Sequence, residues 1–229
     1  MGRMDRDTTS RRRSHQQILK RLESGNIDIL VGTQMIVKGH DFPNVTFVGV
    51  VSADTSLHFP DFRSSERTFQ LLTQVAGRAG RGEVLGEVVI QTYNPDHYSI
   101  LKAKDHDFIG FYQEESQFRK ALDYPPFFRL INFRLVGNSE KRTKAAAEEL
   151  GNMGRALLQR RYRKGIEILG PSAAPFAKMK GKFRWQMLVK GKTSQLLHQF
   201  TQELALLFEG QTRGRGINLD IDVDPVFIL

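Results

Sequence analysis

The sequence predicts an α/β protein in two parts, a parallel sheet covered by helices and then a smaller α+β domain. The first half alternates short apolar runs, typical of strands buried on both faces, with amphipathic helical segments. At 123–128, two adjacent prolines end a helical pattern. The charge balance also changes there, from 16 Lys and Arg against 15 Asp and Glu in 1–122 to 18 against 10 in 123–229. We therefore expect two domains with these bounds.

The first part should contain three strands separated by helices. Ser64 or Ser65 suits the N-cap of the central helix, and Glu66 lies in its first turn. Such alternation indicates parallel strands, whose ligands gather at the carboxyl ends. The predicted elements are a helix at 14–24, strands at 27–33 and 45–51, a helix at 64–77, a strand at 86–92 and a helical segment at 95–122.

The second part has the order β-α-β-β-α-β, which is the ferredoxin-like signature. That fold hosts many functions, so it decides none of them. Its excess of positive charge indicates a polyanionic partner, and a basic surface that serves solubility is the alternative. The predicted elements are a strand at 128–137, a helix at 139–161 that begins at Ser139, strands at 166–178 and 182–191, a helix at 193–210 and a strand at 217–225.

Composition excludes several classes of protein. The chain is 40% hydrophobic and 26% charged, which is typical of a globular protein with an ordinary core. It has no cysteine, so disulfide scaffolds and thiolate metal sites are excluded, and its six histidines show no metal-ligand spacing. No apolar run is long enough for a membrane span, and the start carries no targeting pattern. We expect a cytoplasmic protein without a membrane partner, and a fragment that begins within a domain.

The segment 29–42 ends a buried strand at a position suited to ligand binding. The strand ends at Gly32, and Thr33 stands where a helix N-cap and a phosphate-facing hydroxyl would coincide. Thr33 or Gln34 can bond a nucleic-acid phosphate, and Asp41 can bond a ribose hydroxyl. The alternative is an ordinary strand-to-helix turn with a capping threonine.

The segment 74–82, "QVAGRAGRG", combines glycine with arginine. Gln74, Arg78 and Arg81 have the spacing i, i+4 and i+7, which is one face of a helix. Neighbouring glycines allow a close approach of backbone or phosphate, and two guanidinium groups suit an anion whose charge grows in a transition state. We expect them at the same sheet edge as Thr33. The alternative is a glycine-terminated helix whose arginines pair with Asp61 or Glu83.

These motifs carry a resemblance. "VGTQMIVKGHDF" and "QVAGRAGR" resemble the fifth and sixth motifs of superfamily 2 helicases. Together with "RMDRDTTSRR", "PDFRSSERTFQL", "LGPSAAPFAKMKGKFRWQ" and "DVDP", they are similar to the PriA family of primosomal DNA helicases over essentially the whole chain. The resemblance implies a RecA-like helicase lobe 2, which supplies arginine fingers, and a C-terminal domain that binds branched DNA. It implies an ATP-dependent 3′–5′ helicase that restarts stalled replication forks in the bacterial cytoplasm, associated with the nucleoid.

The same resemblance assigns roles by motif and partners by family. It implies ATP and Mg²⁺ in the full-length protein, and DNA, primosome proteins and single-stranded DNA-binding protein as partners. Because the chain has no phosphate-binding P-loop and no zinc cysteines, we expect no ATP binding by this chain alone and a zinc site outside it. The implied roles are catalytic for Gln74, Arg78 and Arg81, nucleotide-binding for Gly39, Asp41, Gly77 and Gly80, and DNA-binding for Gly32, Thr33, Gln34 and Lys38.

The segment 178–186, "KMKGKFRWQ", alternates cations with aromatic residues in a predicted hairpin. The cations could contact a phosphate backbone, and Trp185 could stack on an unpaired base. The alternative places Phe183 and Trp185 in the core of the sheet, with the cations on the opposite face. A non-enzymatic nucleic-acid-binding module is the competing function. The predicted DNA-binding residues here are Lys178, Lys180, Lys182, Arg184 and Trp185.

Overall fold

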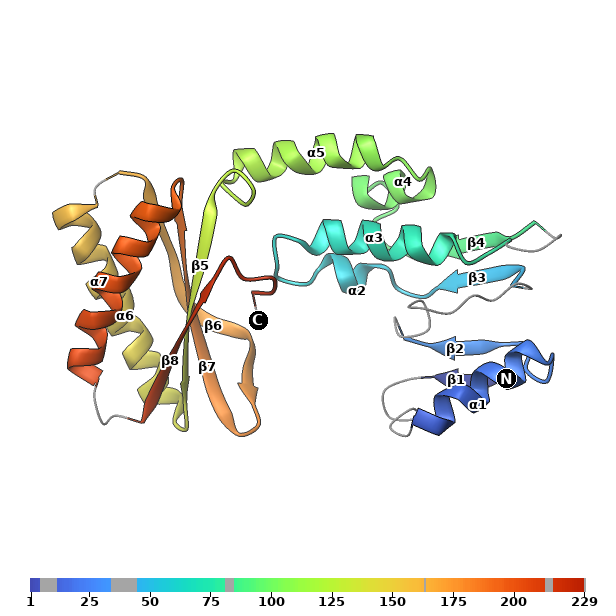
Figure 1. The fold of residues 1–229 in the computed structure, drawn as a ribbon, viewed down its shortest axis with the longest axis horizontal. Coiled ribbons are helices and arrows are strands. Elements are labelled where there is room, and N and C mark those ends of the chain that lie inside the picture. The colour runs from blue at the N-terminus through green and yellow to red at the C-terminus, as the bar shows by residue number, and fades with distance from the viewer. Residues whose placement is uncertain (5–11, 34–44, 81–84, 163, 213–215, 229) are drawn as a thin grey trace. The chain divides into compact units, whose positions relative to one another are not determined.

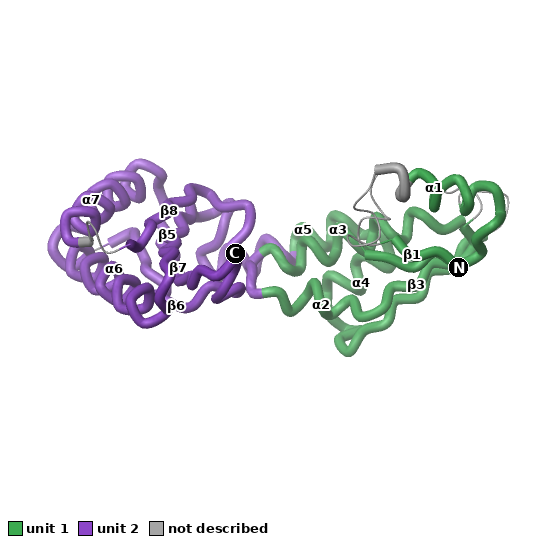
Figure 2. The backbone as a smooth tube through the Cα atoms, turned by 90° about the horizontal axis from the view of Figure 1, so that it is seen from below, with its two compact units in different colours: residues 1–59, 63–113 green, residues 60–62, 114–229 purple. Residues whose placement is uncertain are grey.

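The computed structural model describes residues 1–4, 12–33, 45–80, 85–162, 164–212 and 216–228. The chain divides into two compact units (Figure 2). Unit 1 consists of Met1–Phe59 and Arg63–Gln113, and unit 2 of Pro60–Phe62 and Glu114–Leu229. A three-residue segment in the middle of unit 1 therefore belongs to unit 2.

Unit 1 is built from parallel strand pairs and helices (Figure 1). Among the described residues, β1 pairs with β2 and β3 with β4, both in parallel, as two separate sheets. The predicted α/β class and parallel direction are confirmed, but the described residues do not form a single continuous sheet. The elements are β1 Gly2–Met4, α1 Arg12–Glu23, β2 Leu30–Gly32, β3 Phe47–Val50, α2 Asp54–Leu57, α3 Ser64–Ala76, β4 Glu87–Ile90, α4 Tyr98–Lys104 and α5 Phe108–Ala121, which continues into unit 2.

The largest apolar core of unit 1 lies between its helices and the pair β3–β4. Phe69 on α3 stacks on Phe111 on α5 with ring centroids 4.2 Å apart. Ile100 on α4 joins them, and Val50 and Ile90 pack against this cluster from the strands. Burial of these side chains holds α3 against one face of β3–β4.

Two sequence-based expectations about these helices are wrong. Neither Ser64 nor Ser65 is the N-cap of α3, since Arg63 holds that place and the Ser64 hydroxyl donates to the Phe59 carbonyl. The helical segment 95–122 is broken, because His106 has a φ of 52° and Asp107 caps the next helix by accepting a hydrogen bond from Gly110 N at 2.8 Å.

Unit 2 contains a four-stranded antiparallel sheet in the order β6-β7-β5-β8. Helices α6 and α7 lie on the same side of this sheet (Figure 1), where Phe133, Met187 and Phe200 are fully buried. Each predicted element is present, with ends within two residues of those expected. They are β5 Arg129–Gly137, α6 Glu140–Arg161, β6 Ile166–Met179, β7 Lys182–Gly191, α7 Ser194–Thr212 and β8 Ile217–Val223.

Local chemistry explains where several of these elements begin and turn. Ser139 is the N-cap of α6, as expected, and its side chain accepts from Arg142 N. Strands β6 and β7 are joined by Lys180 and Gly181, both with positive φ (50° and 78°), as a tight two-residue hairpin turn requires. Gly137 ends β5, where an added Cβ would lie 2.8 Å from Ile217 Cδ1.

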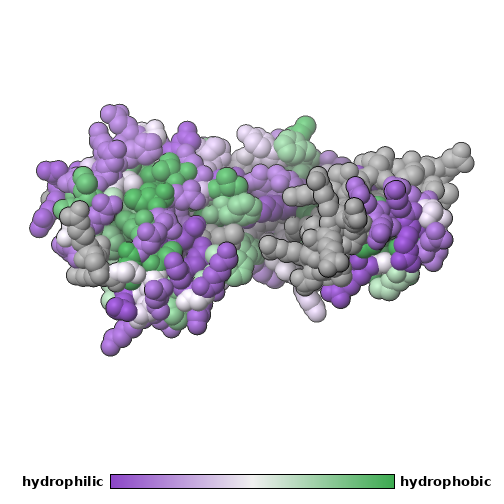
Figure 3. All heavy atoms as spheres, turned by 60° about the horizontal axis from the view of Figure 1, so that its bottom comes forward, coloured by the Kyte–Doolittle hydropathy of each residue, from purple (hydrophilic) through white to green (hydrophobic). Residues whose placement is uncertain are grey.

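Apolar side chains also reach the surface. Leu206 on α7 is 72% exposed and Val226 is 67% exposed. On the face shown in Figure 3, green apolar areas lie among purple polar ones. Within the described ranges, none of the helices combines the length and the apolar character that crossing a membrane requires.

Candidate nucleotide and nucleic-acid interface

The end of α3 positions the described residues of the segment 74–82, called here the arginine-glycine motif. Val75 is buried in unit 1 while Gln74 is exposed on the adjacent position of the helix. The helix ends at Ala76, and Arg78 N bonds Val75 O at 3.0 Å in a further turn. Because α3 ends at Ala76, Arg78 lies beyond the helix and is partly buried, so the expectation that it shares a helical face with Gln74 is not confirmed. Arg81 lies outside the described residues.

Glycine is required at two positions beside Arg78. Gly80 has a φ of +71°, and an added Cβ would lie 2.7 Å from Gly86 N. A Cβ on Gly86 would in turn lie 2.6 Å from Ala79 Cβ. Gly80 N also bonds Val45 O at 3.0 Å, so the loop is closed against the start of β3. The pair Gly80–Gly86 therefore fixes the backbone that follows Arg78, and Gly86 was not identified from the sequence.

Gly77 has no such steric need. It is the C-cap of α3 with a φ of −68°, and the nearest described atom to an added Cβ is Thr73 O at 3.5 Å. Crowding by this chain's own described atoms thus requires glycine at Gly80 but not at Gly77, and the expected close approach of a partner at these glycines stays a prediction. At Gly77 the backbone N–H bonds Thr73 O, which ends the helix.

Arg78 lies in the loop of residues 77–80, called here the arginine loop, and this loop and Thr33 lie beside different pairs of strands. Helix α3 returns the chain from the end of β3 to the start of β4, so Arg78 lies near the amino ends of these strands. Thr33 is exposed just after the carboxyl end of β2, and its N–H bonds Met4 O at 3.4 Å. No described ladder joins β2 to β3, so the expected common edge with Thr33 stays a prediction. Gly32 ends β2 as predicted, and the remaining predicted residues Gln34, Lys38, Gly39 and Asp41 lie outside the described residues.

The carboxyl ends of β3 and β4 carry a polar cluster that was not identified from the sequence. The buried Asp54 carboxylate accepts hydrogen bonds from Asn94 Nδ2 at 2.8 Å, Tyr93 N at 3.0 Å and Thr92 Oγ1 at 3.0 Å. The bond from Asn94 is the largest cause that lowers the pKa of Asp54 from 3.8 to about 2. These residues lie about 40 positions apart in the sequence, so no local pattern indicates their contact. The cluster ties the segments after the two strands together.

The hairpin of unit 2 separates its predicted DNA-binding residues into two groups. Lys178, Lys180 and Lys182 are exposed around the turn, and Lys178 Nζ lies 4.9 Å from the centre of the Phe183 ring. Trp185 is half-buried against the core beneath α6, where Lys144 Nζ lies 5.8 Å from its ring centre. The packing alternative is therefore favoured for Trp185.

Arg184 does not join the exposed lysines. It lies on the helix-free face of β7 and is only 6% exposed. Burial and the nearby Arg134 lower the pKa of Arg184, and Asp220 acts in the opposite sense. The alternation of the strand was predicted correctly, but the face opposite the helices is not solvent-exposed at this position. A phosphate contact by Arg184 is therefore not supported by its position.

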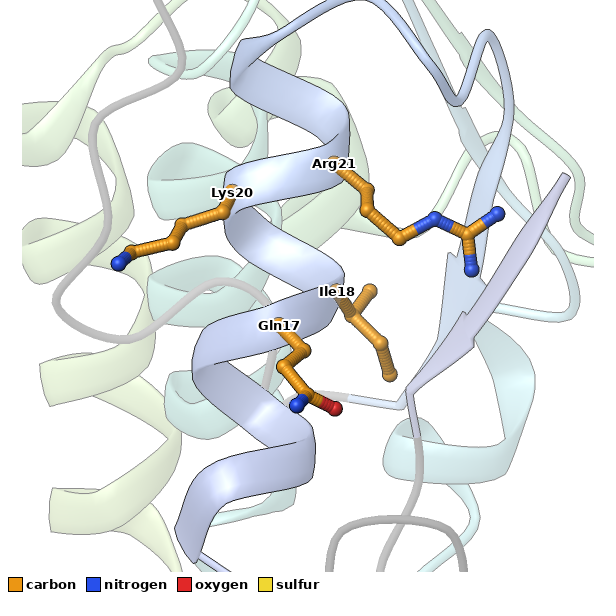
Figure 4. A pocket seen from close by; sticks show the side chains of 4 residues that line it. All are labelled: Gln17, Ile18, Lys20 and Arg21. Atoms are coloured by element: carbon orange, nitrogen blue, oxygen red, sulfur yellow. The ribbon is translucent and has the colours of Figure 1, made fainter.

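Helix α1 bears an open hollow lined by Gln17, Ile18, Lys20 and Arg21 (Figure 4). All four side chains come from one helix, and Lys20 and Arg21 point to opposite sides of it. They do not converge on a common point, so this hollow is not a candidate site.

Comparison with known proteins finds a family model that matches each half of the chain. The family "Helicase conserved C-terminal domain" matches residues 2–83, and "Primosomal protein N C-terminal domain" matches residues 120–226. Replication restart protein PriA of Bacillus subtilis is 44% identical over 99% of this chain and 28% of its own length. The PriA proteins of Synechocystis and Treponema pallidum are 42% and 40% identical over 99% and 97% of this chain.

The chain spans about a quarter to a third of these relatives, at 28%, 26% and 33% of their lengths. The matches run through both units. They include the arginine-glycine motif and the hairpin that carries Lys178, Lys180 and Lys182, called here the lysine hairpin. The chain is therefore similar, over nearly its whole length, to a part of the replication restart proteins named PriA.

Proposed function

We propose that this chain is the C-terminal part of an ATP-dependent 3′–5′ DNA helicase that recognises branched DNA and restarts stalled replication forks. The observation that carries the proposal is the loop after α3, in which the contact between Gly80 and Gly86 fixes the backbone next to Arg78. Similar proteins are named as replication restart proteins. Within this proposal, residues 1–122 form a RecA-like lobe 2. Residues 123–229 form a ferredoxin-like domain, for which the strand order β6-β7-β5-β8 is the support.

In the catalytic role we propose, Arg78 and Arg81 stabilise the charge that grows on the γ-phosphate of ATP. The described residues suit that group, because Arg78 follows the end of a packed helix and the Gly80–Gly86 contact fixes the adjoining backbone. ATP bound with Mg²⁺ supplies the phosphoryl group whose transfer to water drives the helicase. Gln74 lies one turn before Arg78 on the exposed side of α3, where it can orient the same ligand.

The phosphate-cradling loop, the magnesium carboxylate and the zinc cysteines are not found in this sequence. We therefore propose that the chain by itself neither binds ATP tightly nor hydrolyses it, and that the zinc site of the full-length protein lies elsewhere. Primosome proteins and single-stranded DNA-binding protein are proposed partners, and the nucleoid in the bacterial cytoplasm is the proposed location.

The DNA-binding role falls to the basic second part. Lys178, Lys180 and Lys182 are exposed at one end of the sheet and can follow a phosphate backbone. The excess of 18 Lys and Arg over 10 Asp and Glu in 123–229 supports the same surface. Gly32 and Thr33 are exposed at the end of β2 and are the described members of the DNA contacts proposed for unit 1.

Arginine replacement in the full-length protein tests the catalytic role. Arg78→Ala or Arg81→Ala should lower DNA-stimulated ATP turnover by about a thousandfold, with much smaller changes in ATP and DNA affinity. Arg21→Ala, an exposed arginine on α1, is the matched control and should keep normal turnover. If both test variants hydrolyse ATP at the normal rate, the arginines are structural. The alternative, a glycine-terminated helix whose arginines pair with carboxylates, would then stand.

A further inference from the structure

The segment Pro60–Phe62 leaves unit 1 and packs in unit 2, although both of its neighbours in sequence belong to unit 1. The two sides of the segment are joined in unit 1, where Ser64 Oγ donates a hydrogen bond to Phe59 O. Three residues span at most about 10 Å even when extended, so the segment holds little slack.

Within unit 2, Phe62 is held by an aromatic and cationic cluster. Its ring stacks on Tyr124 with centroids 5.0 Å apart and planes at 5°. The Cζ atom of Arg119, a residue of α5, lies 5.3 Å from the centre of the Phe62 ring. Arg119 is itself fixed by a 2.6 Å ion pair with the buried Glu115. Stacking and cation–π contacts of this kind have a narrow geometry, so Phe62 is fixed in orientation as well as position.

The preceding residue, Asp61, is held at a second point. Its carboxylate accepts a hydrogen bond from Ile228 N at 3.2 Å, and both residues are buried. The segment is therefore attached to unit 2 through Tyr124 on one side and through the C-terminal segment on the other.

The Phe62 cluster continues into the strand that begins at the lysine hairpin. Lys190 Nζ lies 4.9 Å from the centre of the Tyr124 ring and donates to Leu122 O at 3.0 Å. Lys190 also pairs with Glu167 on β6 at 2.8 Å. Lys182, one of the exposed lysines, begins the same strand β7 that Lys190 nearly ends.

Helix α3 connects Phe62 to the arginine loop. Arg63, the next residue, is the N-cap of α3, and α3 runs without interruption to Ala76, two residues before Arg78. A helix of 13 residues is a rod about 20 Å long. A shift at Phe62 therefore reaches Arg78 along one packed helix.

We propose that Asp61 and Phe62 are positioning residues, through which the DNA-bound state of unit 2 sets the placement of Arg78 and hence the stimulation of ATP turnover by DNA. This inference rests on the function proposed above. The contacts that carry it are the Phe62–Tyr124 stack and the Asp61–Ile228 hydrogen bond, both within unit 2.

A double-mutant cycle in the full-length protein tests the coupling. Phe62→Ala and Tyr124→Ala should each lower the ratio of DNA-stimulated to basal turnover, while the Kd for forked DNA stays within about twofold. A ring stack corresponds to roughly a two- to tenfold change in an equilibrium, so a reduction of that size is expected. Because both act through one contact, the double variant should be no worse than the poorer single variant.

Conservative and control variants separate coupling from loss of folding. Phe62→Leu keeps apolar volume but removes the stack, and should show the same loss of stimulation with a native unfolding transition. Tyr124→Phe keeps both rings and should retain normal stimulation. Tyr112→Ala removes an exposed tyrosine from the same helix as Arg119, and should change neither quantity.

Normal stimulation in Phe62→Leu, or additive losses in the cycle, would overturn the coupling. Arg78→Ala in the same assay keeps the two proposals distinct. If Arg78→Ala abolishes turnover while Phe62 and Tyr124 variants respond normally to DNA, this inference alone fails. If Arg78→Ala has no effect on turnover, the proposed function fails with it.

Discussion

Replacing Gly80 by alanine should disturb the arginine loop more than an equivalent change elsewhere. Gly80 combines a φ of +71° with a position where an added Cβ would lie 2.7 Å from Gly86 N. Gly25 offers a matched control, because its φ is +72° and no described atom lies within 4 Å of an added Cβ. The two substitutions therefore introduce the same backbone strain and differ in the clash.

The expected magnitudes follow from these two effects. Alanine in the left-handed region costs about 1–2 kcal/mol, which applies to both variants. Backbone displacement to relieve overpacking adds about 1–3 kcal/mol, and it applies to Gly80→Ala alone. The difference between the two variants in the free energy of unfolding should thus be about 1–3 kcal/mol. Gly86→Ala meets the same contact from the other side but has no positive φ, so it should show the cost of overpacking without the left-handed strain.

Two measurements test this reasoning. Urea unfolding of this chain compares the stability of the three variants, and DNA-stimulated ATP turnover of the full-length protein compares their activity. A displacement of about 1 Å at a catalytic side chain can lower the rate about a hundredfold, so Gly80→Ala should lose turnover while Gly25→Ala keeps it. The reasoning is refuted if Gly80→Ala is no less stable than Gly25→Ala and hydrolyses ATP at the normal rate.

Three further outcomes are expected. Because the folded-state pKa of Asp54 lies at about 2 rather than 3.8, its hydrogen bonds stabilise unit 1 fully above pH 3.8 and are lost as the pH falls through about 2. Asp54→Asn should therefore lower thermal stability at neutral pH and flatten its decline on acidification; an unchanged profile contradicts this. Replacing Lys178, Lys180 and Lys182 by glutamine should reduce the slope of log K against log salt by roughly 0.9 for each DNA phosphate that is no longer neutralised, measured by anisotropy with forked DNA; an unaltered slope places the phosphate-binding surface elsewhere. Trp185→Ala should lower stability by up to about 3–5 kcal/mol with little change in DNA affinity, whereas weaker binding without loss of stability would indicate base stacking.

Much of unit 2 was predictable from the sequence because its signals are local. Alternation of apolar residues marks β5 and β7, and Ser139 marks the start of α6 through a hydrogen bond to a backbone only three residues away. Motif, charge and element order all depend on neighbours in the sequence, so they can be read without a tertiary structure.

The remaining features depend on which distant segments meet. Ser64 has the right residue type for an N-cap, but its hydroxyl bonds Phe59 O instead, since the chain turns back on itself there. The alternation of strand β7 predicts that Arg184 is an exposed cation, yet residues outside its strand bury it. The sequence alone determined the family motifs, the order of elements in unit 2 and the uneven charge. The tertiary structure decided the contact between Gly80 and Gly86, the cluster around Asp54 and the packing of Phe62 on Tyr124. Each of these joins residues that no local propensity brings together, because burial and hydrogen bonding act between neighbours in space.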